Sequence, residues 1–177
     1  MIQKSSERLR LLVNGVLEYS QSEKTLSGST EEIQLSSFFK ELENLYKTTS
    51  AFDLTLTTTE DVLHVNKSAF NQIIMNLISN AIHYNEKDVV RIWIELTYNG
   101  KYYEFKVIDN GVCIHTSKID DIFQLFETSG TKDRFGTTGT GIGLSTVSKV
   151  VEKLGGEINV TSEIGVGTTF PFIIKHL

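Results

Sequence analysis

Residues 67–109 read KSAFNQIIMNLISNAIHYNEKDVVRIWIELTYNGKYYEFKVID, a stretch that predicts one helix followed by two strands. Its first part repeats apolar residues at the spacing of an amphipathic helix, at Phe70, Ile73, Ile74, Leu77, Ile78 and Ala81. The segments VVRIWIELTYN and YYEFKVID read as strands, and the Asn99-Gly100 pair between them is a strong hairpin-turn signal. A helix beside an antiparallel hairpin is typical of the α+β class.

The chain before this stretch predicts three strands and a helix. Residues 31–35 suit a short strand and residues 35–50 a helix. In residues 52–59 apolar side chains alternate with threonine, which favours a half-buried strand. We expect residues 61–65 to be its hairpin partner.

The chain after this stretch ends with another helix and two strands. The helix spans residues 144–154 and stops at a Gly-Gly pair, as helix C-termini prefer. Strands follow at residues 157–162 and 168–175, and Pro171 predicts an edge position for the second. The fold expected is a two-layer α/β sandwich of the α+β class: a mixed, mostly antiparallel sheet, helices on one face, and an additional N-terminal helix.

The N-terminal helix is expected over residues 5–24, where Leu9, Leu12, Val13, Val16 and Leu17 form one apolar stripe. It is either docked on its own domain or the last helix of a hairpin whose other half is missing. We favour the truncated hairpin, because residues 21–30 resemble a linker. The expected division is residues 1–27 for helix and linker and residues 28–177 for the main domain.

Composition narrows the function classes. The 177 residues carry 17 Lys and Arg against 22 Asp and Glu, a formal charge of −5, which argues against a nucleic-acid partner. Cys113 is the single cysteine and excludes a disulfide framework. The apolar runs are far shorter than the roughly 20 residues that cross a bilayer, and the N-terminus has no apolar signal-peptide core. We therefore expect a cytoplasmic domain, whether or not its parent protein is membrane-anchored.

Polar residues on the apolar helix are the first sign of chemistry. Asn76 and Asn80 are four residues apart and project from one side of the helix, which His83 and Tyr84 continue. They form either an ordinary polar edge or the lining of a ligand site. Asparagine oxygens suit a hard cation such as magnesium, which also binds phosphate oxygens.

Two glycine-containing segments follow. Asp109 ends a strand and precedes Gly111, which makes either a tight turn or an acceptor for an exocyclic amine beside a close backbone approach. Gly139, Gly141 and Gly143 lead into the second helix, whose N-terminus favours phosphate. The same glycines also suit a flexible surface loop.

The order of these features resembles the ATP-binding domain of sensor histidine kinases, a relative of gyrase, the ninety-kilodalton heat-shock chaperone and the mismatch-repair ATPases. Residues 76–81 (NLISNA) resemble the N box and residues 109–114 (DNGVCI) the first glycine box. Residues 123–126 (FQLF) resemble the F box and residues 139–144 (GTGIGL) the second glycine box. The resemblance covers about residues 30–177.

This resemblance implies ATP and Mg²⁺ as ligands and assigns roles to individual residues. Asn80 would hold the magnesium with Asn76 beside it, and Asp109 would accept the adenine amino group. Lys132 or Arg134, in a lid from Glu127 to Gly141, would stabilise the γ-phosphate. The other residues implied to contact nucleotide are His83, Tyr84, Gly111, Ile114, Phe126, Gly139, Thr140, Gly141, Ile142, Gly143, Leu144 and Thr168.

The resemblance also favours a kinase over an ATPase. Related ATPases carry a water-activating Glu where this chain has Asn76, and an amide cannot act as a base. The phosphoryl acceptor would be a histidine on the missing hairpin helix, the parent a homodimer, and the downstream partner a response-regulator receiver domain. The alternative is a degenerate module that binds partners but no nucleotide, because His83 replaces the usual Lys or Arg and Cys113 a usual glycine.

Overall fold

A computed structural model describes residues 13, 16, 17, 20, 29–47, 51–128, 133–137 and 139–176. Its helices are α2 (Leu35–Lys47), α3 (Lys67–His83) and α4 (Gly143–Lys153), with a 3₁₀ turn η1 (Thr116–Lys118). Its strands are β1 (Glu31–Gln34), β2 (Phe52–Thr58), β3 (Val62–Val65), β4 (Val90–Tyr98), β5 (Tyr102–Asp109), β6 (Glu157–Ile158), β7 (Thr161–Glu163) and β8 (Gly167–Lys175). The predicted α+β sandwich is confirmed.

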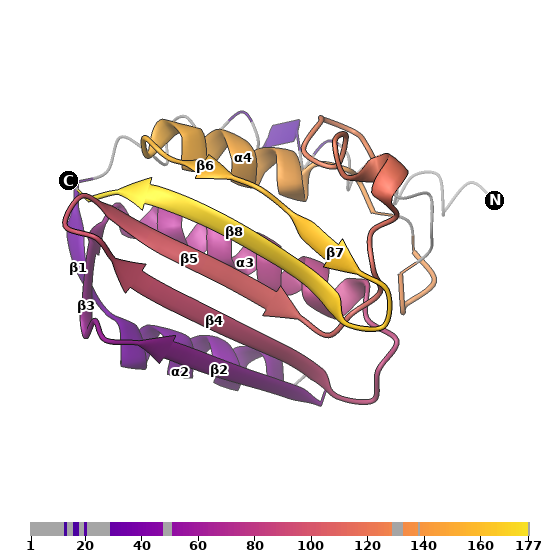
Figure 1. The fold of residues 1–177 in the computed structure, drawn as a ribbon, viewed down its shortest axis with the longest axis horizontal. Coiled ribbons are helices and arrows are strands. Elements are labelled where there is room, and N and C mark those ends of the chain that lie inside the picture. Colours follow the sequence, from indigo (N-terminus) through magenta and orange to yellow (C-terminus); the bar gives the residue numbers. More distant parts are fainter. Residues whose placement is uncertain are drawn as a thin grey trace.

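The main sheet has the order β2-β4-β5-β8-β6, with β7 also paired to β8. The pairing of β2 with β4 is parallel and the other pairings are antiparallel, so the sheet is mixed. The helices lie along one face of this sheet (Figure 1). No described helix lies on the opposite face, here called the uncovered face, as in many antiparallel sheets.

The expected hairpin between β2 and β3 is wrong. Strand β3 pairs with β1 in a separate two-stranded sheet, and β2 takes its place beside β4. In that arrangement Leu63 and Val65 of β3 are fully buried together with Ile33 of β1. Burial of these side chains against the helices outweighs the preference of neighbouring strands to pair with each other.

The edge position expected for Pro171 is also wrong, because β8 lies inside the sheet between β5 and β6–β7. Strands β6 and β7 share one register along β8, and the ladder is interrupted at Asn159, opposite Pro171. The Asn159 N–H donates to the Pro171 carbonyl at 2.9 Å. The return hydrogen bond is missing because proline has no N–H. Pro171 therefore splits the predicted strand 157–162 into two short strands.

The core forms between α3 and the sheet. The buried face of α3 is the predicted apolar stripe, and Phe70, Ile73 and Ile78 have no exposed surface. Phe105 of β5 and Phe172 of β8 stack at 4.7 Å beneath it. At the N-terminus of the helix the Asn66 side chain caps the first turn by accepting the Ala69 N–H at 2.9 Å. Burial of each large side chain contributes about 1.5–3 kcal/mol.

The N-terminal helix is described only in part. Val13, Val16 and Leu17 are helical and exposed, and Ser20 is helical; the other residues of 5–24, the linker up to residue 28 and the expected boundary at residue 27 lie outside the described residues. None of the described helices is both long and apolar enough to cross a membrane.

Candidate functional site

Asp109 sits at the C-terminal end of β5, on the face of the sheet that the helices cover. Only 7% of its surface is exposed, and one carboxylate oxygen accepts the Gly111 N–H at 2.7 Å. Burial raises the pKa of Asp109 to about 6, against the opposing effect of backbone hydrogen bonds from Gly111 and Thr168. A charged group is retained here at an energetic cost, which is typical of functional sites.

Gly111 allows two segments to come together. A methyl group at this position would lie 2.7 Å from the Tyr84 carbonyl oxygen and 2.8 Å from the Asp109 carboxylate. The glycine is thus needed for close approach, and its φ lies outside the left-handed region. The Tyr84 carbonyl accepts the Val112 N–H at 2.9 Å, which ties the end of α3 to the first glycine box.

Tyr84 also reaches the second glycine box. Its hydroxyl lies where a methyl group on Gly139 would be, and burial raises its pKa. Beneath it, the fully buried Asn85 donates to the Asn110 side chain at 2.8 Å. These contacts hold α3, the end of β5 and the lid around one site.

The two ends of the lid meet at Phe126 and Gly141. The Phe126 N–H donates to the Gly141 carbonyl at 2.9 Å. A methyl group on Gly141 would lie 2.5 Å from backbone atoms of Phe126 and Glu127, and the φ of Gly141 is 69°. Phe126 itself has a φ of 68°, the one positive value among the described non-glycine residues. Close backbone contact thus closes the base of the lid.

Helix α4 begins with its N–H groups open. Ile142 precedes it without a side-chain cap, and its first turn holds no acidic residue. A methyl group on Gly143 would lie 3.1 Å from the amide oxygen of Asn76. Uncapped N–H groups and the helix dipole together favour an anion such as phosphate at this point.

Asn80 lies one turn beyond Asn76 and is half-buried. Within the described residues its side chain forms no hydrogen bond, whereas the Asn76 amide nitrogen donates to the Gln72 carbonyl at 2.9 Å. Among these same residues, no three His, Cys, Asp or Glu side chains cluster so as to hold a metal ion. Two amide oxygens fit a magnesium ion only if phosphate and water supply the other ligands, as is usual for magnesium.

The remaining residues that we predicted to contact nucleotide have fewer contacts that link them to the site. The Thr168 hydroxyl lies 3.0 Å from Ser162, whose hydroxyl also accepts the Ile114 N–H at 2.9 Å. The guanidinium of Arg134 is exposed; it lies 3.5 Å from the Lys87 carbonyl oxygen and 6.0 Å from the centre of the Phe135 ring. Lys132 lies outside the described residues. Thr140 and Leu144 are half-buried and Ile142 is buried, beside the lid glycines.

Comparison with known proteins identifies this arrangement. The model of the family described as histidine kinase-, DNA gyrase B-, and HSP90-like ATPase matches residues 65–177, more than half of the chain. The chain belongs to this ATPase family. The matched region contains α3, β5, the lid, α4 and β8, and therefore every element of the site.

Similarity to individual proteins shows which branch of the family this chain resembles. The circadian input-output histidine kinase CikA of Synechococcus elongatus is 32% identical over 180 residues, which cover 96% of this chain and 23% of CikA. Full-length ShkA in complex with AMPPNP has a TM-score of 0.77 at 20% identity, over 97% of this chain and 36% of that one. Histidine kinase ThkA in complex with the response regulator protein TrrA has a TM-score of 0.70 at 22% identity, over 99% and 49%. The ATPase domain thus resembles sensor histidine kinase catalytic domains, and spans less than a quarter of CikA.

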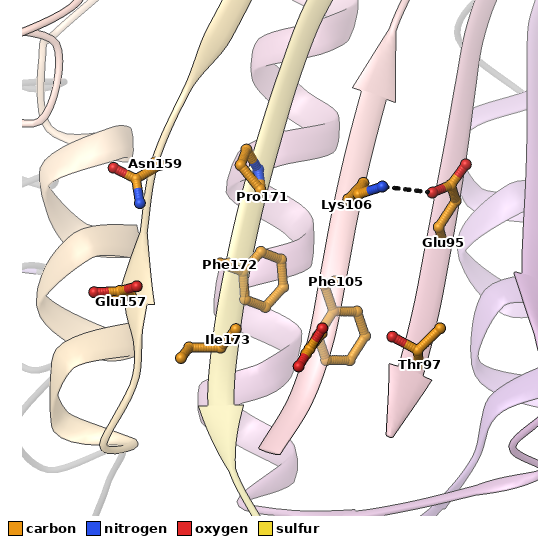
Figure 2. Close-up of a pocket in the computed structure, with 10 residues that line it drawn as sticks. Glu95, Thr97, Phe105, Lys106, Glu157, Asn159, Pro171, Phe172 and Ile173 are labelled. Atoms are coloured by element: carbon orange, nitrogen blue, oxygen red, sulfur yellow. Dashed lines mark ion pairs between the residues drawn. The ribbon is translucent and has the colours of Figure 1, made fainter. Parts of the chain in front are cut away.

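A hollow lies away from this ATPase site, on the uncovered face of the sheet. It has a volume of about 260 Å³, and Figure 2 shows side chains of β4, β5, β6 and β8 around it. Lys106 and Glu95 form an ion pair there at 3.3 Å, beside Pro171 and Ile173. Neither glycine box contributes to it, so its shape does not mark the nucleotide site.

Sequence reasoning missed one residue of the ATPase lid. Asp133 is buried and pairs with His83 at 2.7 Å. A short turn motif, in which Asp133 is followed by Gly136 and Thr137, is the only sequence signal for it. Cys113, which stands where the resembled family has a glycine, is half-buried, and its φ lies outside the left-handed region. The backbone at this position therefore does not require glycine.

Proposed function

We propose that the chain is the ATP-binding catalytic domain of a two-component sensor histidine kinase, which transfers the γ-phosphate of ATP to a histidine outside this chain. The observation that carries this proposal is that α3 and the residue after it touch both glycine boxes. The Tyr84 carbonyl lies against Gly111, beside the buried carboxylate of Asp109, and the Tyr84 hydroxyl lies against Gly139. The amide oxygen of Asn76 faces Gly143 at the uncapped start of α4. The ShkA complex with AMPPNP, an ATP analogue, supports the same ligand class.

In this proposal different groups of the protein bind the two ends of the nucleotide, the adenine base and the phosphates. Asp109 accepts a hydrogen bond from the adenine amino group, which guanine lacks at that position, so ATP is preferred over GTP. The N–H groups of Gly143 and its neighbours receive phosphate oxygens. Asn80, with Asn76, holds Mg²⁺, whose charge would offset that of the phosphates.

Asn76 supports phosphoryl transfer to a protein over transfer to water. Its amide nitrogen already donates to a helix carbonyl, so its oxygen is directed toward Gly143. An amide oxygen orients or ligates but removes no proton at neutral pH. The charge stabilisation proposed for Lys132 or Arg134 fits a reaction that depends mainly on positioning and electrostatics.

The partners proposed are those of a kinase of this type. The acceptor is the histidine-bearing hairpin of the parent protein, which we propose is a homodimer acting in the cytoplasm. The downstream partner is a receiver domain; ThkA, in complex with the response regulator protein TrrA, gives the precedent. No observation favours the alternative of a nucleotide-free scaffold module.

A nucleotide titration tests the proposal. Wild-type chain is titrated with ATP and with GTP at saturating magnesium, alongside Asp109→Asn and the control Asp53→Asn, which removes an exposed carboxylate from β2. We expect ATP-selective binding by the wild type and the control, and loss of that selectivity in Asp109→Asn. Equal binding of ATP and GTP by the wild type, or no binding, would contradict the proposed site.

A further inference from the structure

A short part of the lid, residues 133–137, is folded around the carboxylate of Asp133. One oxygen accepts the Phe135 N–H at 3.0 Å and the Thr137 N–H at 2.8 Å. The other accepts the Thr137 hydroxyl at 2.5 Å and lies 2.7 Å from His83 Nδ1. Only 2% of the Asp133 side chain is exposed.

The hydrogen bonds and the ring contact that join the described residues 133–137 to α3 all end on His83. Besides the Asp133 pair, the Arg134 N–H donates to the His83 carbonyl at 2.9 Å. The Phe135 ring meets the His83 ring edge to face at 5.2 Å. His83 is the last residue of α3 and directly precedes Tyr84, whose carbonyl and hydroxyl contact the two glycine boxes. The segment is therefore attached at the point from which the site is organised.

We propose that the His83–Asp133 pair is a latch that pins the lid to the end of α3, and that Asp133 is thereby a positioning residue for nucleotide binding. This inference rests on the proposed function, since it concerns the same nucleotide site. A lid already held in place loses less conformational freedom when ligand binds, so the latch strengthens binding.

The chemistry of the pair fits this role. Burial alone raises the pKa of Asp133, but hydrogen bonds from Thr137 and His83 outweigh it and hold the pKa at about 2. Asp133 therefore remains a carboxylate throughout the physiological range. A hydrogen bond from an imidazole N–H to such an anion is stronger than one between neutral groups.

A double-mutant cycle separates the latch from a direct role of His83. His83→Phe keeps a ring against Phe135 but removes Nδ1. Asp133→Asn keeps an oxygen for the Phe135 and Thr137 N–H groups but removes the charge. We expect each variant to weaken Mg-ATP binding by about five- to tenfold, a typical coupling between sites, chiefly through faster dissociation. The double variant should bind no more weakly than either single one, because the pair acts as a unit.

Amide hydrogen exchange supplies a second readout. The Phe135 and Thr137 amides should exchange faster in His83→Phe than in the wild type, because the segment is released from α3. Asp120→Asn removes an exposed carboxylate outside the site and should change neither exchange nor affinity.

Two results would overturn the latch alone: wild-type affinity in Asp133→Asn, or losses that add in the double variant, which would mean that His83 acts on nucleotide by itself. No nucleotide binding by the wild-type chain would overturn the proposed function together with this inference.

Discussion

Asp109 shows at the scale of one residue how function and stability oppose each other. The carboxylate is buried among backbone groups, and its pKa is raised to about 6 from 3.8. A raised pKa means that the folded state favours the protonated acid. The stabilisation by that proton is complete below pH 3.8 and is lost as pH rises through 6. At neutral pH, therefore, the ionised Asp109 destabilises the fold.

Asp109→Asn should consequently stabilise the protein. An amide oxygen can still accept the Gly111 N–H, and the buried charge is gone. The shift in pKa corresponds to at most about 3 kcal/mol, so we expect a gain of roughly 1–3 kcal/mol at pH 7.5. Urea unfolding of the two proteins measures it. The gain should vanish at pH 4; a variant that is less stable than the wild type at pH 7.5 would contradict the assigned burial cost.

The same carboxylate predicts how ATP binding depends on pH. The ionised Asp109 is a stronger acceptor for the adenine amino group than the protonated acid, so affinity should fall as pH falls through 6. At pH 5.5 we expect binding at most about fourfold weaker than at pH 7.5 on account of this group. Calorimetric titration at both pH values tests this, and Asp109→Asn, which lacks the titrating group, corrects for protonation of ATP itself. If ATP affinity changed with pH as much in Asp109→Asn as in the wild type, Asp109 would not be the adenine acceptor.

At the scale of elements, the lid depends on glycine for two different reasons. Gly141 and Gly136 both have positive φ, 69° and 75°. Only Gly141 has backbone atoms where a methyl group would be; around Gly136 the space is open. Alanine at Gly136 therefore tests the cost of a left-handed backbone alone, whereas alanine at Gly141 adds a steric clash with neighbouring backbone atoms.

We expect Gly136→Ala to cost about 1–2 kcal/mol in lid stability, the penalty for a left-handed alanine. Gly141→Ala carries the same penalty and also forces Phe126 away from the lid base, so it should weaken ATP binding well beyond Gly136→Ala. Thermal unfolding and ATP titration of both variants measure the difference. Equal affinities would show that the base of the lid need not close.

The elements also show where sequence patterns are sufficient. Periodicity predicts α3 and the β4–β5 hairpin, because each is defined by neighbours along the chain. It does not predict the partner of β3 or the inner position of β8, because both depend on which distant strand buries the same side chains. Local turn chemistry cannot show that Asp133 pairs with a residue 50 positions earlier.

At the scale of the whole molecule, nucleotide binding should stabilise the fold. The site joins α3, β5, the lid and α4, so ligand that binds only the folded chain raises its unfolding temperature. At 100 times the dissociation constant the gain is about 2.7 kcal/mol, which corresponds to roughly 5–10 °C for a chain of this size. Differential scanning fluorimetry with Mg-ATP should show this shift and Mg-GTP a smaller one. A larger shift with GTP would reverse the proposed selectivity.

Two contacts between the motifs were easier to predict than the lid. Asp109 and Gly111 lie beside Tyr84, and Asn76 lies beside Gly143, so the boxes meet α3 in the order that the motifs imply; their roles toward nucleotide stay a prediction. Motif order carries this information because each box follows one element of a fixed topology. The lid has no periodic pattern, so the latch at Asp133 could be found only from the structure.

Chemical-shift mapping tests the central claim most directly, because the proposed nucleotide site and the hollow beside Lys106 lie on opposite faces of the sheet. Mg-ATP is added to isotopically labelled chain, and the backbone amides are followed by NMR. We expect large chemical-shift changes at Gly111, Gly139, Gly143 and Thr168, and little change at Glu95 and Lys106 on the uncovered face. Shifts confined to the uncovered face, or none at all, would contradict it.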